Sequence, residues 1–89
     1  MKIKLKMVMS ALGEEYILVP VGGSESSFQG LIRLNETGAE IWKGISQGLD
    51  EKQIVSRLLA EYDGVDEETA RRAVRKIIDQ LKVEGILEE

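Results

Sequence analysis

The sequence predicts a single α+β domain in which a three-stranded antiparallel sheet is followed by three helices. Residues 2–34 show the period-two alternation and the turn residues of strands, whereas residues 35–85 repeat apolar residues every three to four positions between capping and stop signals. The short links between the strands favour antiparallel pairing. Eighty-nine residues with 43% hydrophobic content are enough for one core and too few for two domains.

The three expected strands are separated by glycine-containing turns. Lys2 to Met9 alternates apolar residues with lysines, which is the pattern of a half-buried strand. Residues 10–14 form the first turn, and Glu15 to Val19 is rich in residues that favour strands. Residues 22–27 form a connection of glycine and serine, and Phe28 to Leu34 is the third strand.

The third strand is expected to lie at an edge of the sheet, because it comes last and a helix follows it. An edge strand presents unpaired N–H and C=O groups to a visiting strand. Gly30 would let another backbone approach closely, or it is a bulge in an ordinary edge strand. Alternation places Phe28, Gly30, Ile32 and Leu34 on one face, and Gln29, Leu31 and Arg33 on the other.

The first helix is expected from Glu36 to Gln47. Asn35 can cap it, and Gly48 is suited to the left-handed conformation that ends helices. One face of this helix collects Gly38, Ile41, Trp42 and Ile45 at helical spacing. Glycine near a helix start is unfavourable, so the sequence predicts a close backbone approach there.

Two further helices follow with their own boundary signals. Asp50 with Gln53 forms a capping box at the start of the second helix, which ends at Gly64. The third helix begins at Asp66 and ends at Gly85. The buried stripe of the second helix is Ile54, Val55, Leu58, Leu59 and Tyr62; that of the third is Ala70, Ala73, Val74, Ile77 and Leu81.

The third helix carries a candidate binding surface beside its buried stripe. Advancing about 100° per residue places Ile78 at the edge of the stripe, bordered by Arg71, Arg75 and Lys82. One interpretation is a wide core face with a solvated basic flank. The other is a shallow apolar pocket with a basic rim, suited to an acidic and apolar peptide.

Composition excludes several functions. The chain has no cysteine and no histidine, which removes disulfides, thiolate metal sites and nucleophilic catalysis by a Ser–His or Cys–His pair. Net charge is −4, with thirteen acids against eight cations in residues 35–89, so a broad basic surface for nucleic acid is not expected. Neither a signal peptide nor a membrane span is apparent, which favours a cytoplasmic protein.

The order of these features resembles the PqqD family. The resemblance rests first on Asn35-x-Thr37-Gly38-Ala39-x-Ile41-Trp42, at the junction between strand and helix. It extends from about Gly13 to Leu87, because similar segments lie upstream and downstream in the same order. These segments are Gly13-Glu14-Glu15-Tyr16-Ile17-Leu18-Val19, Leu49 to Tyr62, and Leu81-x-x-x-Gly85-Ile86-Leu87.

The resemblance implies a small winged helix-turn-helix-like domain without catalytic activity or cofactor. Such a domain binds the leader segment of a ribosomally made precursor peptide (RiPP) and presents it to a modifying enzyme, often a radical S-adenosylmethionine (radical SAM) protein. The pathway would be that of pyrroloquinoline quinone (PQQ) or another peptide product. The third strand and third helix are implied to form the groove, with peptide-binding residues Gly30, Leu31, Ile32, Arg33, Arg71, Val74, Arg75, Ile78 and Lys82.

Two other functions stay open on the sequence. A winged-helix DNA-binding regulator would use Arg71, Arg72, Arg75 and Lys76 on its third helix. The acids on the same helix and the negative net charge count against it. A dimerisation module is the third alternative.

Overall fold

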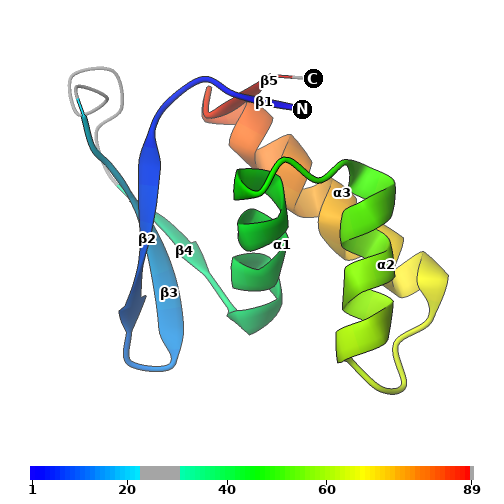
Figure 1. Cartoon of the computed structure of the whole chain (residues 1–89). Helices are drawn as coiled ribbons and strands as arrows, with labels where there is room; N and C mark the ends of the chain where they lie inside the picture. The colour runs from blue at the N-terminus through cyan, green and yellow to red at the C-terminus, as the bar shows by residue number, and fades with distance from the viewer. Residues whose placement is uncertain (23–30, 89) are drawn as a thin grey trace.

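The computed structural model describes residues 1–22 and 31–88. It has the predicted order of a three-stranded sheet followed by three helices, with the helices gathered on one side of the sheet (Figure 1). The strands are β1 (Lys2–Ile3), β2 (Met7–Leu12), β3 (Glu15–Pro20), β4 (Ile32–Leu34) and β5 (Leu87–Glu88). The helices are α1 (Glu36–Ser46), α2 (Glu51–Glu61) and α3 (Glu67–Val83).

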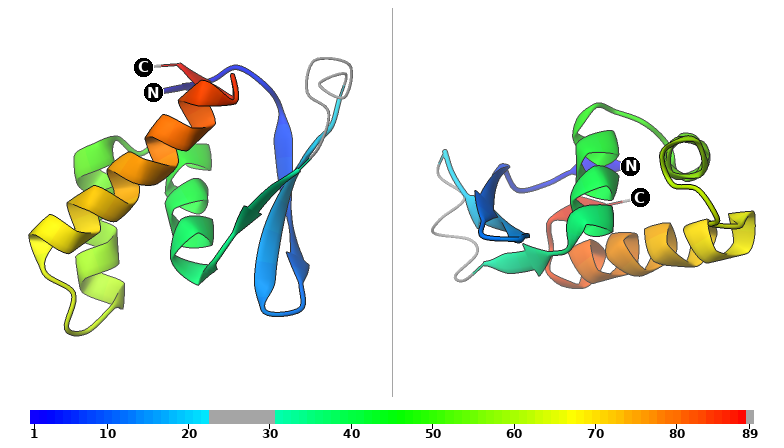
Figure 2. Two further views of the ribbon diagram at one scale, coloured as in Figure 1. Left: turned by 180° about the vertical axis from the view of Figure 1, so that it is seen from behind. Right: turned by 90° about the horizontal axis from the view of Figure 1, so that it is seen from below.

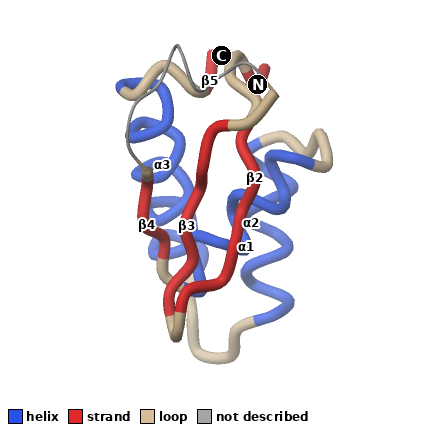
Figure 3. Tube along the Cα trace, turned by 90° about the vertical axis from the view of Figure 1, so that its left-hand side faces the viewer, coloured by secondary structure: helices blue, strands red, loops and turns tan. Residues whose placement is uncertain are grey.

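The main sheet is antiparallel and has the order β2-β3-β4. Val8 pairs with Val19 across the first hairpin, and Ile17 pairs with Arg33 across the second interface. Figure 3 shows this sheet in front of the helices, with β4 at one edge and β2 at the other. The edge position expected for the third strand is therefore confirmed for Ile32–Leu34, while Phe28 to Gly30 lie outside the described residues.

A second, two-stranded sheet differs from the sequence prediction. The expected strand Lys2 to Met9 is divided at Leu5, so that β1 pairs with β5 and β2 enters the main sheet. The Lys4 N–H also donates to the Ile86 carbonyl at 2.7 Å. The two ends of the described chain consequently lie side by side (Figure 1). Period-two alternation gives the faces of a strand but not its partner, which is why this division was not predicted.

The helix boundaries agree with the capping signals. Asn35 Oδ1 accepts a hydrogen bond from the Gly38 N–H at 2.8 Å. Asp50 and Gln53 form the complete capping box, with bonds of 2.8 and 2.9 Å. Asp66 Oδ1 accepts from the Thr69 N–H at 2.8 Å, and this bond lowers the pKa of the Asp66 carboxyl.

The core lies between the inner face of the main sheet and the three helices. Trp42, predicted to be buried, is 4% exposed, and it packs in one cluster with residues of the sheet, α2 and α3. The close approach expected at Gly38 is made by the Leu34 side chain, 3.2 Å from where a Cβ would stand, and not by another backbone. Gly44 is tighter still, since a Cβ there would lie 2.9 Å from Ile54 Cγ1.

Candidate functional site

One of the two edges of the main sheet is formed by β4. Ile32 and Leu34 turn inward and are buried, whereas Leu31 is 50% exposed and Arg33 is exposed, as the alternation predicted. In the described residues β4 pairs only with β3, so its other side is not hydrogen-bonded to a strand. Backbone groups on that side are available to an added strand.

A groove lies between β4 and α3 and reaches the start of α1. Its volume is about 330 Å³. The chain turns from β4 into α1 at Asn35, so that the first turn of α1 forms one end of the groove. Figure 2, right, shows α3 running past α1 toward β4. We call it the β4–α3 groove. The residues that line it are Arg33, Leu34, Asn35, Thr37, Gly38, Ile41, Ala73, Lys76, Ile77 and Gln80.

The β4–α3 groove combines an apolar floor with cationic edges. Ala73 and Ile77 are half-buried on α3 and pack against the core while keeping surface toward the groove. Lys76 and Arg33 are exposed. Arg33 has an ion pair with Glu15 at 3.6 Å, but both side chains are more than half exposed, so water screens this pair. The groove can therefore offer apolar contact and positive charge to the same ligand.

The structure corrects the position proposed for Ile78 and Val74. Both are 0% exposed and belong to the core cluster, so neither side chain can line a peptide groove in this conformation. Ile78 was expected at the edge of the buried stripe, beside solvent. In the structure α2 packs against that flank of α3, which moves the centre of the buried face toward Ile78 and leaves Ile77 half-buried on the other side.

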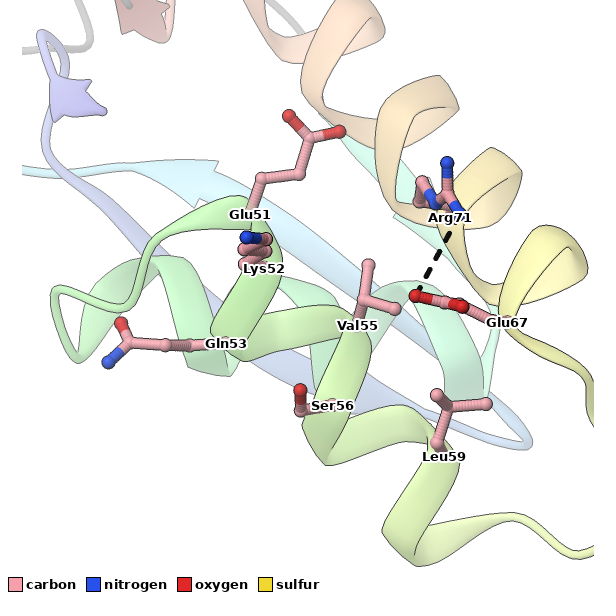
Figure 4. A pocket seen from close by; sticks show the side chains of 8 residues that line it. All are labelled: Glu51, Lys52, Gln53, Val55, Ser56, Leu59, Glu67 and Arg71. Atoms are coloured by element: carbon pink, nitrogen blue, oxygen red, sulfur yellow. Dashed lines mark ion pairs between the residues drawn. The ribbon is translucent and has the colours of Figure 1, made fainter.

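The two arginines that were expected to form the rim also lie on the flank that faces α2. Arg75 pairs with Glu51 of α2 at 2.9 Å and with Asp79 at 3.1 Å. Arg71 pairs with Glu67 at 3.8 Å and lines a separate groove of about 800 Å³ between α2 and α3 (Figure 4). Lys82 is exposed and is not among the residues that line the β4–α3 groove.

Of the eight predicted site residues that the structure describes, Arg33 alone lines the β4–α3 groove. Leu31 and Ile32 belong to the strand that borders the groove, with Ile32 buried, and Gly30 lies outside the described residues. Sequence reasoning missed Ala73, Lys76, Ile77 and Gln80 as a surface, although their spacing of three and four residues places them on one side of α3. A helical wheel shows two flanks beside a buried stripe, and it does not show which flank the strand occupies.

The part of the chain at residues 1–22 and 31–88 contains no group of three or more acidic, histidine or cysteine side chains placed to hold a metal ion. Its helices include none with the length and apolar character needed to cross a membrane.

Comparison with known proteins gives two matches. The model of the family described as coenzyme PQQ synthesis protein D (PqqD) matches residues 15–87. A solved structure, TbiB1 in complex with the TbiA(beta) leader peptide, is similar with a TM-score of 0.77 and 27% sequence identity, covering 99% of this chain and 95% of that chain. No curated protein matches this chain.

Proposed function

Because this chain belongs to the PqqD family, we propose that it binds the leader segment of a ribosomally made precursor peptide and presents that segment to a modifying enzyme. The observation that supports this most strongly is the similarity, over almost the whole of both chains, to a protein whose solved structure is a complex with a leader peptide. The domain itself supplies no chemistry in this proposal.

The proposed binding mode is the addition of one strand to the free edge of β4. An extended peptide there would continue the sheet order β2-β3-β4 by a fourth strand, using backbone groups of residues 31–34. Main-chain hydrogen bonds give such complexes affinity, and pockets for alternate side chains give them specificity. The β4–α3 groove supplies that pocket, since it lies between the edge strand and Ala73, Lys76, Ile77 and Gln80 of α3.

The proposed consequence of binding is a high local concentration of the precursor beside its enzyme. A peptide held by its leader makes the subsequent encounter with the enzyme effectively intramolecular. The partner that we propose is a peptide-modifying enzyme, of the radical SAM class or another, and the cytoplasm is the compartment in which the two would meet. The product is PQQ or another modified peptide.

Calorimetry with the leader segment of a precursor peptide, sought as a short open reading frame beside this gene, tests the proposal. We expect micromolar or tighter binding with one peptide per chain. The same chain titrated with labelled duplex DNA at low salt should show no binding, because the chain carries a net charge of −4 and acids stand beside Arg71, Arg72 and Arg75 on α3. Submicromolar DNA binding that disappears with added salt, together with no peptide binding, would instead support the alternative function of a winged-helix DNA-binding regulator.

A further inference from the structure

The charge of the β4–α3 groove is opposite to that of the whole chain. The protein has 16 acids against 12 cations, yet the described residues that line this groove include Arg33 and Lys76 and no carboxylate. The groove between α2 and α3 differs, because Glu51 and Glu67 stand there with Lys52 and Arg71. Positive charge is thus concentrated at the groove beside the free strand edge.

Lys76 takes no part in the ion pairs that the other described cations at the centre of α3 form. Arg71 and Arg72 each pair with a glutamate four residues before, and Arg75 pairs with Asp79 four residues after. Four residues from Lys76 the chain has Arg72 on one side and Gln80 on the other, and Asp79, three residues after Lys76, pairs with Arg75. Among the described residues Lys76 has no ion pair, and its exposed ammonium group is available to a ligand in the groove.

The register of an added strand decides which peptide side chains contact Arg33 and which contact the apolar residues of α3. Side chains of neighbouring strands that stand directly opposite point to the same face of the sheet and lie about 4.5–5.5 Å apart at Cβ. A peptide residue opposite Arg33 therefore points to the outer face, where Arg33 is exposed. The peptide residues before and after it point to the helix face, toward Ala73 and Ile77.

From this arrangement we propose that the edge of β4, with Arg33 on the outer face and the β4–α3 groove on the helix face, selects a leader segment with an apolar–acidic–apolar alternation. The acidic side chain would stand opposite Arg33, and the apolar side chains on either side of it would pack on Ala73 and Ile77. Lys76, at the α3 edge, would add to the preference for an acidic segment. This inference rests on the proposed function, since it specifies the chemistry of the peptide that the same site binds.

Selection from random ten-residue peptides displayed on phage tests the inference with the full chain as the target. We expect the enriched peptides to contain an Asp or Glu between two large apolar residues. In a synthetic enriched peptide, replacing that acid by its amide should weaken binding about twofold to fivefold, and added salt should weaken binding of the parent peptide.

Charge-reversal variants test whether Arg33 and Lys76 cause the preference for acidic peptides. Arg33→Glu and Lys76→Glu should each weaken binding of the acidic peptide about threefold to tenfold, and selection on Arg33→Glu should no longer enrich acids at the central position. Arg72→Glu is the matched control, because it makes the same charge change on an exposed residue of α3 that does not line the groove. All three positions are exposed, and unchanged melting curves would confirm that the variants are folded.

The outcomes distinguish the inference from the proposed function. Enriched peptides without acids, bound equally well by the parent and by both groove variants, would overturn the charge preference and leave peptide binding intact. Equal loss of affinity in Arg72→Glu would show that net charge, and not the groove, is responsible, and would also overturn it. Failure to enrich any peptide would count against the proposed function itself.

Discussion

Truncating two neighbouring isoleucines of α3 should separate stability from binding. Ile78 is 0% exposed in the core, so Ile78→Ala removes buried methyl groups and leaves a cavity; such changes cost about 2–5 kcal/mol. Ile77 is half-buried and lines the β4–α3 groove, so Ile77→Ala should cost clearly less in stability. Its main effect should be on peptide affinity, with a loss of about tenfold, which corresponds to about 1.4 kcal/mol.

Thermal unfolding and calorimetry on both variants provide the assay. For a domain of this size each kcal/mol shifts the melting temperature by about 4–8 °C, so Ile78→Ala should melt at least about 8 °C below the parent. Ile77→Ala should melt closer to the parent and bind the leader more weakly. The reasoning is refuted if the two variants exchange roles, that is, if Ile78→Ala keeps its stability and loses affinity while Ile77→Ala unfolds and the folded fraction binds normally.

Three further predictions concern the fold. Trp42→Ala should lower the free energy of unfolding by about 3–5 kcal/mol in a denaturant titration, because the large side chain is 4% exposed in the core; an unchanged midpoint would contradict this. Gly44→Ala should be destabilising by about 1–3 kcal/mol in the same titration despite the better helix propensity of alanine, because its Cβ would stand 2.9 Å from Ile54 Cγ1; a gain in stability would contradict the close packing. The pKa of the Asp66 carboxyl is lower in the folded than in the unfolded chain, so its contribution to stability is complete above the unfolded value of about 3.9 and is lost as pH falls through the folded value. Unfolding measured between pH 2 and 6 should show this loss, and Asp66→Asn, which keeps a capping oxygen without the charge, should reduce it.

The elements of the fold could be predicted because local signals define them. The oxygens of Asn35, Asp50 and Asp66 cap helices within three residues of sequence, and each accepts the expected bond. The alternation of Ile32 and Arg33 likewise gave the correct faces of β4. By contrast, the pairing of β1 with β5 joins opposite ends of the chain, and no local pattern indicates it.

The candidate site could be predicted only in part, since it depends on how α3 is rotated against its neighbours. The sequence indicated the strand and the helix that border the β4–α3 groove. It placed the groove on the flank of Arg71 and Arg75, which α2 occupies in the structure, and not on the flank of Lys76 and Ile77. That choice depends on which side of α3 the chain places α2, and helical periodicity alone does not contain this information.

Amide hydrogen exchange of the chain with and without the bound leader tests the central claim most directly. The main sheet has two edges, β4 and β2, and strand addition should protect amides on one of them only. We expect slower exchange in residues 31–34 when the peptide is bound, with Met7–Leu12 unchanged. Protection of Met7–Leu12 without any change in residues 31–34 would contradict strand addition at β4 and place the peptide on the opposite edge.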